Sequence, residues 1–203
     1  MRLYRFRFST NVERVALALA FKGLEVESVW IDPEDRTPVR EASGQDLVPV
    51  LEDEGEIVAD STRILEHLDA RFPDPPLYPR EAARRGEVVV FIDWFNRVWK
   101  SAPNEIEAEL SRDRPDEERI GELAGEMASS LNLFEAILAG RDYLTGEFSA
   151  ADCAAFPFLK YGVLHDPEDT ELFHRILADN LPVGAAHPRL RAWIERVDER
   201  PRA

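Results

Sequence analysis

Two short stretches of the chain carry residue types that could hold an anionic, peptide-like ligand. The first is Leu47-Val48-Pro49-Val50-Leu51, in which a proline stands at the entrance of an apolar strand. Because proline has no backbone N–H, it belongs at the first residue of a strand or on the edge of a sheet. A cis bond there is typical of a tight turn, and such a turn would leave the N–H and C=O of Val48 for a ligand backbone. Simple strand termination is the alternative interpretation of Pro49.

The second stretch is Asp60-Ser61, which stands at the start of a helical pattern. The free N–H groups and the dipole at a helix N-terminus attract a carboxylate. Asp60 adds acceptors and Ser61 adds a hydroxyl. Together with Val48, these residues predict a clamp for something peptide-like and anionic, whereas simple N-capping is the alternative interpretation of Asp60.

Composition narrows the classes of function. The chain has 203 residues with a formal net charge of -15, and 44% of its residues are hydrophobic, as in ordinary globular proteins. Nucleic acid needs clustered Lys and Arg, and an anionic membrane surface repels an acidic protein, so neither is an expected partner. No apolar run approaches the roughly 20 residues of a membrane span, and residues 1–7 do not look like a signal peptide. We therefore expect a cytoplasmic protein.

Cysteine and histidine usage points away from disulfides and metals. Cys153 is the only cysteine, so it cannot form an internal disulfide, and its place in a helical pattern predicts a buried packing residue. The four histidines, at 67, 165, 174 and 187, have no metal-ligand spacing. No metal cofactor is expected.

The elements that must position the clamp follow from the periodicity of apolar residues. The predicted elements are a strand at 3–8, a helix at 12–22, a strand at 26–31, a short helix at 37–43, two strands joined by a hairpin at 53–55, and a helix at 61–71. Residues 1–72 thus predict a small α/β domain. Because a helix separates the first two strands, they should run parallel, whereas the hairpin must be antiparallel.

The rest of the chain predicts a second, all-helical domain. The proline-rich segment 73–80 cannot continue a helix and is expected to be an extended linker. The predicted elements of 81–203 are one long helix at 81–109 or two meeting near Pro103, a helix capped by Asp113 and running to Leu138, and helices at 169–177 and 187–199. Ser149 and Asp152 match a capping box for a further helix.

This order of elements resembles the cytosolic glutathione S-transferase superfamily over nearly the whole chain. Five stretches carry the resemblance: Ser9 to Leu19, Leu47 to Leu51, Asp60 to Leu65, Leu77-Tyr78-Pro79, and Tyr143 to Asp152. The first is similar to the nucleating loop and helix of the serine-type classes (zeta-, tau- or theta-like, or an unassigned bacterial-like class). The resemblance implies a thioredoxin-like N-terminal domain followed by a C-terminal helical bundle, and a homodimer.

The resemblance also implies a cosubstrate and roles for the clamp residues. The cosubstrate would be glutathione or another low-molecular-weight thiol, with Val48 pairing with the cysteinyl backbone. Ser61 would bind the γ-glutamyl carboxylate, and Asp60 would face the ammonium group. Ser9 would contact the sulfur and stabilise the thiolate, which is the form that attacks. Helix capping is the alternative role of Ser9.

Thr10 and Asn11 are the backup donors to the sulfur. An electrophile would bind beside Phe8, Trp99 and Asn104. Trp94 is assigned to packing, and Arg63 to a dimer interface or a surface charge.

The sequence departs from the family where a basic residue often precedes the Val-Pro pair. Gln45-Asp46 stands there, and an inward Asp46 would repel a glycyl carboxylate. The resulting hypothesis is a transferase of a thiol to an apolar electrophile, and the alternative is a non-catalytic binding or assembly protein of the same fold.

Overall fold

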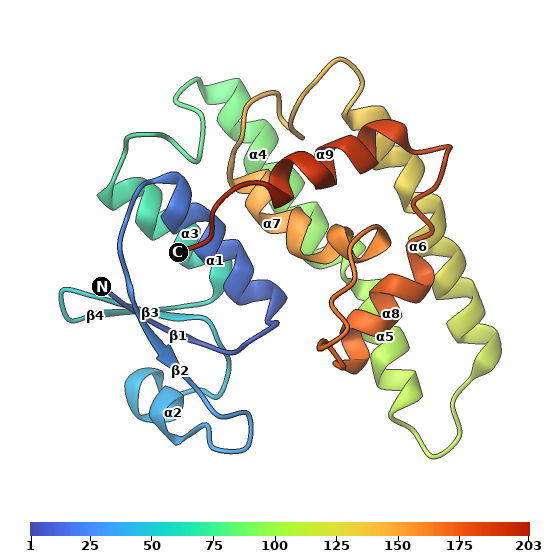
Figure 1. The fold of residues 1–203 in the computed structure, drawn as a ribbon, viewed down its shortest axis with the longest axis horizontal. Coiled ribbons are helices and arrows are strands. Elements are labelled where there is room, and N and C mark those ends of the chain that lie inside the picture. The colour runs from blue at the N-terminus through green and yellow to red at the C-terminus, as the bar shows by residue number, and fades with distance from the viewer. The chain divides into compact units, whose positions relative to one another are not determined.

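The computed structural model describes residues 1–203 and divides into two compact units (Figure 1). The first unit comprises Met1–Arg80 and Arg200–Ala203, and the second comprises Glu81–Glu199. The predicted linker 73–80 belongs to the first unit, and so do the last four residues, which were predicted to lie with the helical domain. No helix of either unit is long and apolar enough to cross a membrane.

The first unit is a four-stranded sheet with helices on both faces (Figure 1). Its elements are β1 (Arg2–Arg5), α1 (Thr10–Phe21), β2 (Glu27–Trp30), α2 (Thr37–Ser43), β3 (Val50–Asp53), β4 (Glu56–Ala59) and α3 (Ser61–Arg71). The strand order is β2-β1-β3-β4, with β1 and β2 parallel and the pairs β1–β3 and β3–β4 antiparallel. The predicted thioredoxin-like domain is confirmed, with its parallel first pair of strands and its antiparallel hairpin.

Alternation along the strands divides the core into two layers. Tyr4 and Val50 pair in register and face the small cluster that contains Val39 of α2. Their neighbours Leu3 and Leu51 also pair, are fully buried, and point to the opposite face, because successive strand residues alternate. Helices α1 and α3 contact each other on that opposite face.

Strand β1 is shorter than the predicted 3–8. The amide of Ile31 bonds to the carbonyl of Arg5 at 3.0 Å, and no pairing of β1 continues beyond Arg5. Phe8 has a φ of 63°, a left-handed conformation that cannot belong to an extended strand. The chain therefore turns at residues 7–8 and enters α1 at Thr10.

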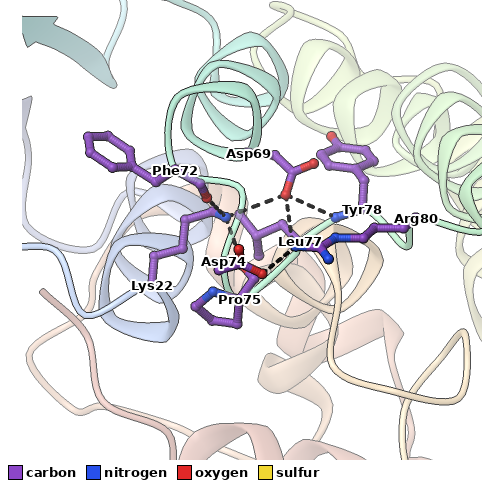
Figure 2. A network of polar contacts seen from close by, with 8 residues as sticks. All are labelled: Lys22, Asp69, Phe72, Asp74, Pro75, Leu77, Tyr78 and Arg80. Carbon is purple, nitrogen blue, oxygen red and sulfur yellow. Dashed lines mark hydrogen bonds and ion pairs between the residues drawn. The ribbon is translucent and has the colours of Figure 1, made fainter.

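A buried network joins the ends of α1 and α3 to the proline-rich segment (Figure 2). Lys22 Nζ lies 3.4 Å from Asp69 Oδ1 and donates to the carbonyls of Phe72 at 2.6 Å and Pro75 at 2.9 Å. The same carboxylate oxygen accepts the amide of Leu77 at 2.7 Å. Because Lys22 and Asp69 are both buried, the segment 72–78 is fixed on the first unit rather than left as a free linker.

The second unit is entirely helical, as predicted. Its elements are α4 (Ala82–Trp94), a π-helical turn η1 (Phe95–Trp99), α5 (Ser101–Leu110), α6 (Glu117–Ile137), α7 (Ala150–Leu159), a 3-10 turn η2 (Lys160–Gly162), α8 (Leu172–Asn180) and α9 (Pro188–Asp198). The long helix predicted at 81–109 is interrupted at η1 and not at Pro103. Pro103 lies in the first turn of α5, where an amide has no intrahelical acceptor to lose.

Two other helix boundaries differ from the sequence prediction. Helix α6 begins after Asp116, whose side chain accepts the amide of Arg119 at 3.1 Å, and not after Asp113. Helix α8 begins at Leu172, three residues beyond Asp169, and its N-cap is Glu171. The Asp169 carboxylate accepts from Tyr161, His174 and the amide of Glu171.

The capping box that begins α7 is confirmed. The Ser149 side chain accepts the amide of Ala151, and Asp152 Oδ2 accepts the amide of Ser149 at 2.9 Å. Asp152 Oδ1 also accepts the amide of Leu144 at 3.0 Å and Trp193 Nε1 at 2.8 Å. This one carboxylate therefore connects α7, α9 and the loop before α7.

An aromatic cluster fills the centre of the helical unit. Phe95 stacks on Trp99 with ring centroids 4.5 Å apart, and Phe134 meets both rings edge-on. Cys153 is fully buried on α7, as predicted for a packing residue.

Candidate functional site

The strand register gathers both halves of the predicted clamp at one edge of the sheet. Val50 pairs with Ala59 on β4 and with Tyr4 on β1. Because these pairs are antiparallel, the chain before Val50 and the chain after Ala59 leave the sheet side by side. Val48 and Ser61 are each two residues from that pair, so they lie on the same edge. The loop that follows β1 leaves the sheet at this edge too.

Val48 lies outside the hydrogen-bonded ladder. The ladder of β3 begins at Val50, and the Val48–Pro49 peptide bond is cis. Pro49 and Val50 are buried, whereas Val48 is half-buried. The backbone of Val48 is therefore presented at the sheet edge, which suits pairing with an extended ligand.

The backbone at Asp60 is strained, and its side chain caps α3. Asp60 has φ 77° and ψ 125°, a conformation that side-chain-bearing residues rarely adopt and that costs of order 1–3 kcal/mol. Its Oδ1 accepts the amides of Thr62 at 2.9 Å and Arg63 at 3.1 Å, and its carbonyl accepts the amide of Ile64 at 2.9 Å. The amide of Ser61 is not among those that Asp60 accepts, and it lies at the positive end of the helix dipole, which suits a ligand carboxylate.

The Ser61 hydroxyl is held by two residues of α1. Arg14 Nη1 donates to Ser61 Oγ at 3.3 Å, and Ser61 Oγ donates to Asn11 Oδ1 at 3.5 Å. Arg14 is only 2% exposed and Ser61 is 4% exposed. The sequence reasoning missed Arg14. The run Val12 to Leu19 holds two charged residues, Glu13 and Arg14, and only the structure shows that Arg14 is the buried one.

Ser9 is the N-cap of α1, which is the alternative role considered from the sequence. Its Oγ accepts the amide of Val12 at 3.3 Å, and Ser9 is half-buried. A hydroxyl that accepts through a lone pair keeps its own proton to donate, so capping and a hydrogen bond to a sulfur are compatible. Thr10 is 6% exposed and Asn11 bonds to Ser61, so Ser9 is the most accessible hydroxyl of this loop.

The loop before Val48 is fixed, and its acidic residue is paired. Asp46 Oδ1 lies 2.7 Å from Arg40 Nη2, and its carbonyl accepts Arg36 Nη1 at 3.2 Å. The Gln45 amide group makes two 2.6 Å hydrogen bonds to the backbone of Leu47. Arg36 and Arg40 of the α2 region are therefore both engaged by Asp46, one through its carbonyl and the other through its carboxylate.

The residues expected around an electrophile are placed as follows. In the first unit, Phe8 is half-buried in the turn before α1 with the Arg7 guanidinium over its ring at 4.6 Å. In the second unit, Asn104 is exposed on α5, whereas Trp99 is 5% exposed and donates from Nε1 to Ser130 Oγ at 2.9 Å. Trp99 thus belongs mainly to the aromatic core, leaving little of its surface for a substrate.

A cavity of about 600 Å³ opens within the helical unit, between α4 and the end of α6. Trp94, assigned to packing from the sequence, lines it together with Val90 and Leu133, and the Glu87–Arg141 ion pair of 2.6 Å stands at its rim. No group of three His, Cys, Asp or Glu side chains is arranged to hold a metal ion.

A four-stranded thioredoxin-like unit with a cis-proline just before β3, followed by an all-helical unit, defines a two-domain fold class. The glutathione S-transferase N-terminal domain profile matches residues 3–76, and the glutathione S-transferase C-terminal domain profile matches residues 93–196. The chain belongs to the glutathione S-transferase family.

Three relatives that are similar to this chain carry different protein names. Glutathione S-transferase L3 of Arabidopsis thaliana is 26% identical over 98% of this chain and 78% of its own length. A maleylacetoacetate isomerase of Pseudomonas aeruginosa is 39% identical over 42% of this chain and 43% of its own length. A stringent starvation protein A homolog of Pasteurella multocida is 27% identical over 78% of this chain and 73% of its own.

A solved glutathione S-transferase from Rhodospirillum rubrum has a TM-score of 0.76 and is 26% identical, covering 98% of this chain and 88% of that one. The structural match therefore extends over both units.

Proposed function

We propose that this chain is a glutathione-dependent transferase that joins the thiol of glutathione, or of a close analogue, to an apolar electrophile. The observation that carries the proposal is that Val48 and Ser61 lie on the same edge of the sheet. The backbone of Val48 is outside the strand ladder, and the amide of Ser61 is not bonded by Asp60. The two groups suit a peptide backbone and a carboxylate, which glutathione carries together.

Ser9 is the proposed catalytic residue. A free thiol with a pKa near 8.5 is mostly protonated at neutral pH, so a donor beside the sulfur increases the thiolate fraction. The Ser9 hydroxyl accepts from Val12 and retains its proton, which supplies such a donor next to the N-terminus of α1. The thiolate attacks the electrophile, the new carbon–sulfur bond forms, and the leaving group departs with the electron pair.

The ion pair of Asp46 answers the expectation that this residue would repel the glycyl carboxylate of glutathione. Asp46 is paired with Arg40, and Arg36 donates to the carbonyl of Asp46, so the charge of Asp46 does not stand unopposed toward a second carboxylate near residues 45–47. We therefore propose glutathione, with two carboxylates, as the first thiol to test. Phe8 of the first unit remains a proposed contact of the electrophile. In the second unit Asn104 is exposed on α5, and Trp99 contributes through packing.

Turnover of an aryl halide by the Ser9→Ala variant tests the catalytic role. We expect kcat to fall at least tenfold while the Kd for glutathione changes less than threefold, because Val48 and Ser61 are untouched. Ser9→Thr keeps a hydroxyl and is the matched control, expected to retain more activity. Since losing the cap costs about 1 kcal/mol, thermal stability is measured in parallel to separate unfolding from lost chemistry. Unchanged kcat in Ser9→Ala would refute the role.

A non-catalytic binding protein is the second candidate. It is favoured by a relative whose name, stringent starvation protein A homolog, does not describe a transferase. This candidate predicts no thermal stabilisation by millimolar glutathione, γ-glutamylcysteine or cysteine. A clear upward shift of Tm with any of these thiols would show that the chain binds a thiol, and would exclude this second candidate.

A homodimer in the cytoplasm is the proposed working state, because members of the family are typically homodimers. Val90 is 69% exposed and Leu133 is 44% exposed beside the cavity of the helical unit, so this face suits burial against a second copy. Light scattering that gives the mass of one chain at micromolar concentration would refute the dimer.

A further inference from the structure

We propose that Arg14 is a positioning residue for the carboxylate end of the thiol site, acting through the Ser61 hydroxyl. The inference rests on the proposed function, since it assigns a role within that site. Arg14 lies on α1 and Ser61 is the first residue of α3, and the two helices contact each other.

The direction of the hydrogen bonds fixes the hydroxyl. A guanidinium can only donate, so Ser61 Oγ accepts from Arg14 Nη1 at 3.3 Å. The single proton of that hydroxyl is then directed to Asn11 Oδ1 at 3.5 Å. Ser61 Oγ is therefore committed to the protein, and the group that Ser61 presents to a ligand is its backbone amide.

The same chain of contacts joins the two ends of the site. Asn11 belongs to the first turn of α1, directly after Ser9 and Thr10, where the sulfur is proposed to lie. Ser61 belongs to the first turn of α3, where the carboxylate is proposed to lie. Arg14 contacts Ser61 from below the surface and so holds the spacing between these two turns.

Helix packing alone does not require a charge at this position. Val15 and Leu19 on the same helix and Ile64 on α3 are buried apolar residues that make the ordinary contacts of a core. Removing an arginine from water costs several kcal/mol, which a well-packed apolar side chain would avoid. A buried guanidinium behind the α3 N-terminus instead adds positive charge near the place where a carboxylate would bind.

Binding by the folded full-length chain separates a positioning role from a structural one. Isothermal titration compares glutathione with cysteinylglycine, a thiol that lacks the γ-glutamyl carboxylate. Arg14→Met keeps an unbranched apolar stem, Arg14→Lys keeps the charge, and Ser61→Ala removes the link. We expect Arg14→Met to weaken glutathione binding at least tenfold and cysteinylglycine binding less than twofold. Arg14→Lys should recover part of the loss.

The double variant Arg14→Met/Ser61→Ala should bind glutathione no more weakly than the worse single variant, because both changes break one chain of contacts. Two results would overturn the role of Arg14 and leave the proposed function standing. One is an equal loss of affinity for both thiols. The other is an unchanged affinity for glutathione in both Arg14→Met and Ser61→Ala, while the wild type binds glutathione. Failure of the wild type to bind either thiol would overturn both.

Discussion

Replacing Asp152 by alanine is expected to destabilise the helical unit by about 3 kcal/mol at pH 7. Its carboxylate is completely buried and accepts the amides of Leu144 and Ser149 and Nε1 of Trp193, at 2.8 to 3.0 Å. Three buried N–H groups would lose their acceptor, and at roughly 2 kcal/mol each the loss is about 6 kcal/mol.

Part of that loss is offset because the charged carboxylate is itself costly. Burial raises the pKa of Asp152 from 3.8 to about 6, against the hydrogen bonds that lower it. Keeping the group ionised at pH 7 therefore costs about 3 kcal/mol, at 1.36 kcal/mol per pKa unit. The alanine variant avoids this cost, which brings the net penalty to about 3 kcal/mol.

The pH dependence of the penalty gives an independent check. A carboxyl whose pKa is raised in the folded state binds its proton more tightly there, so its contribution to stability increases as pH falls through 6 and is complete below 3.8. Between pH 7 and pH 5 the wild type should gain about 1.3 kcal/mol relative to the variant. The penalty of Asp152→Ala should thus rise to about 4 kcal/mol at pH 5.

Urea denaturation followed by far-UV circular dichroism at both pH values measures these penalties. Asp142→Ala, which removes an exposed carboxylate 3.7 Å from Arg196, is the matched control, with an expected change below about 0.5 kcal/mol. A penalty for Asp152→Ala below about 1 kcal/mol at pH 7, or one that shrinks on acidification, would refute the reasoning.

Further predictions concern the other buried charges. Asp69→Ala should cost about 3–5 kcal/mol in urea denaturation, because it leaves Lys22 buried without its ion partner, whereas Lys22→Met in the same background should recover part of the loss. A double variant less stable than Asp69→Ala would contradict this. Burial works to raise the pKa of Asp169, but hydrogen bonds from His174 and Tyr161 outweigh it and hold that pKa below its usual value. The stabilisation is therefore present above pH ~4 and lost as pH falls through the folded pKa. The penalty of Asp169→Asn should fade on acidification below pH ~4, and one that grows there would contradict the assignment.

The sequence predicted element types well because each type has a local cause. Helix α7 begins directly after its N-cap Ser149, because the capping box is a short-range pattern. Gly23 and Gly44 follow their helices with positive φ. Strand β1 was overextended because alternation continues through Phe8, whereas the positive φ there depends on how the chain must turn into α1. The interruption at 95–99 had no local sign such as a proline.

The candidate site was predictable only where residues act through the backbone. Val48 and Ser61 could be proposed because proline and helix starts have sequence signatures, and the structure places both at one end of the β3–β4 pair. The contact of Arg14 with Ser61 joins residues 47 positions apart, and periodicity assigns such a residue to the helix without showing what it meets. Likewise the Asp46–Arg40 pair depends on how the loop folds back on α2, so the expected repulsion could not be corrected from composition alone.

The last residues of the chain have a consequence for the order in which the first unit is completed. Arg202 pairs with Glu13 at 3.0 Å, and the amide of Ala203 bonds to the carbonyl of Ala16 at 3.1 Å, so this segment lies along α1. During synthesis these residues emerge only after the whole helical unit, since translation runs from the N-terminus. The first unit can therefore form its sheet early, but it gains these contacts on α1 only after residues 81–199 have been synthesised.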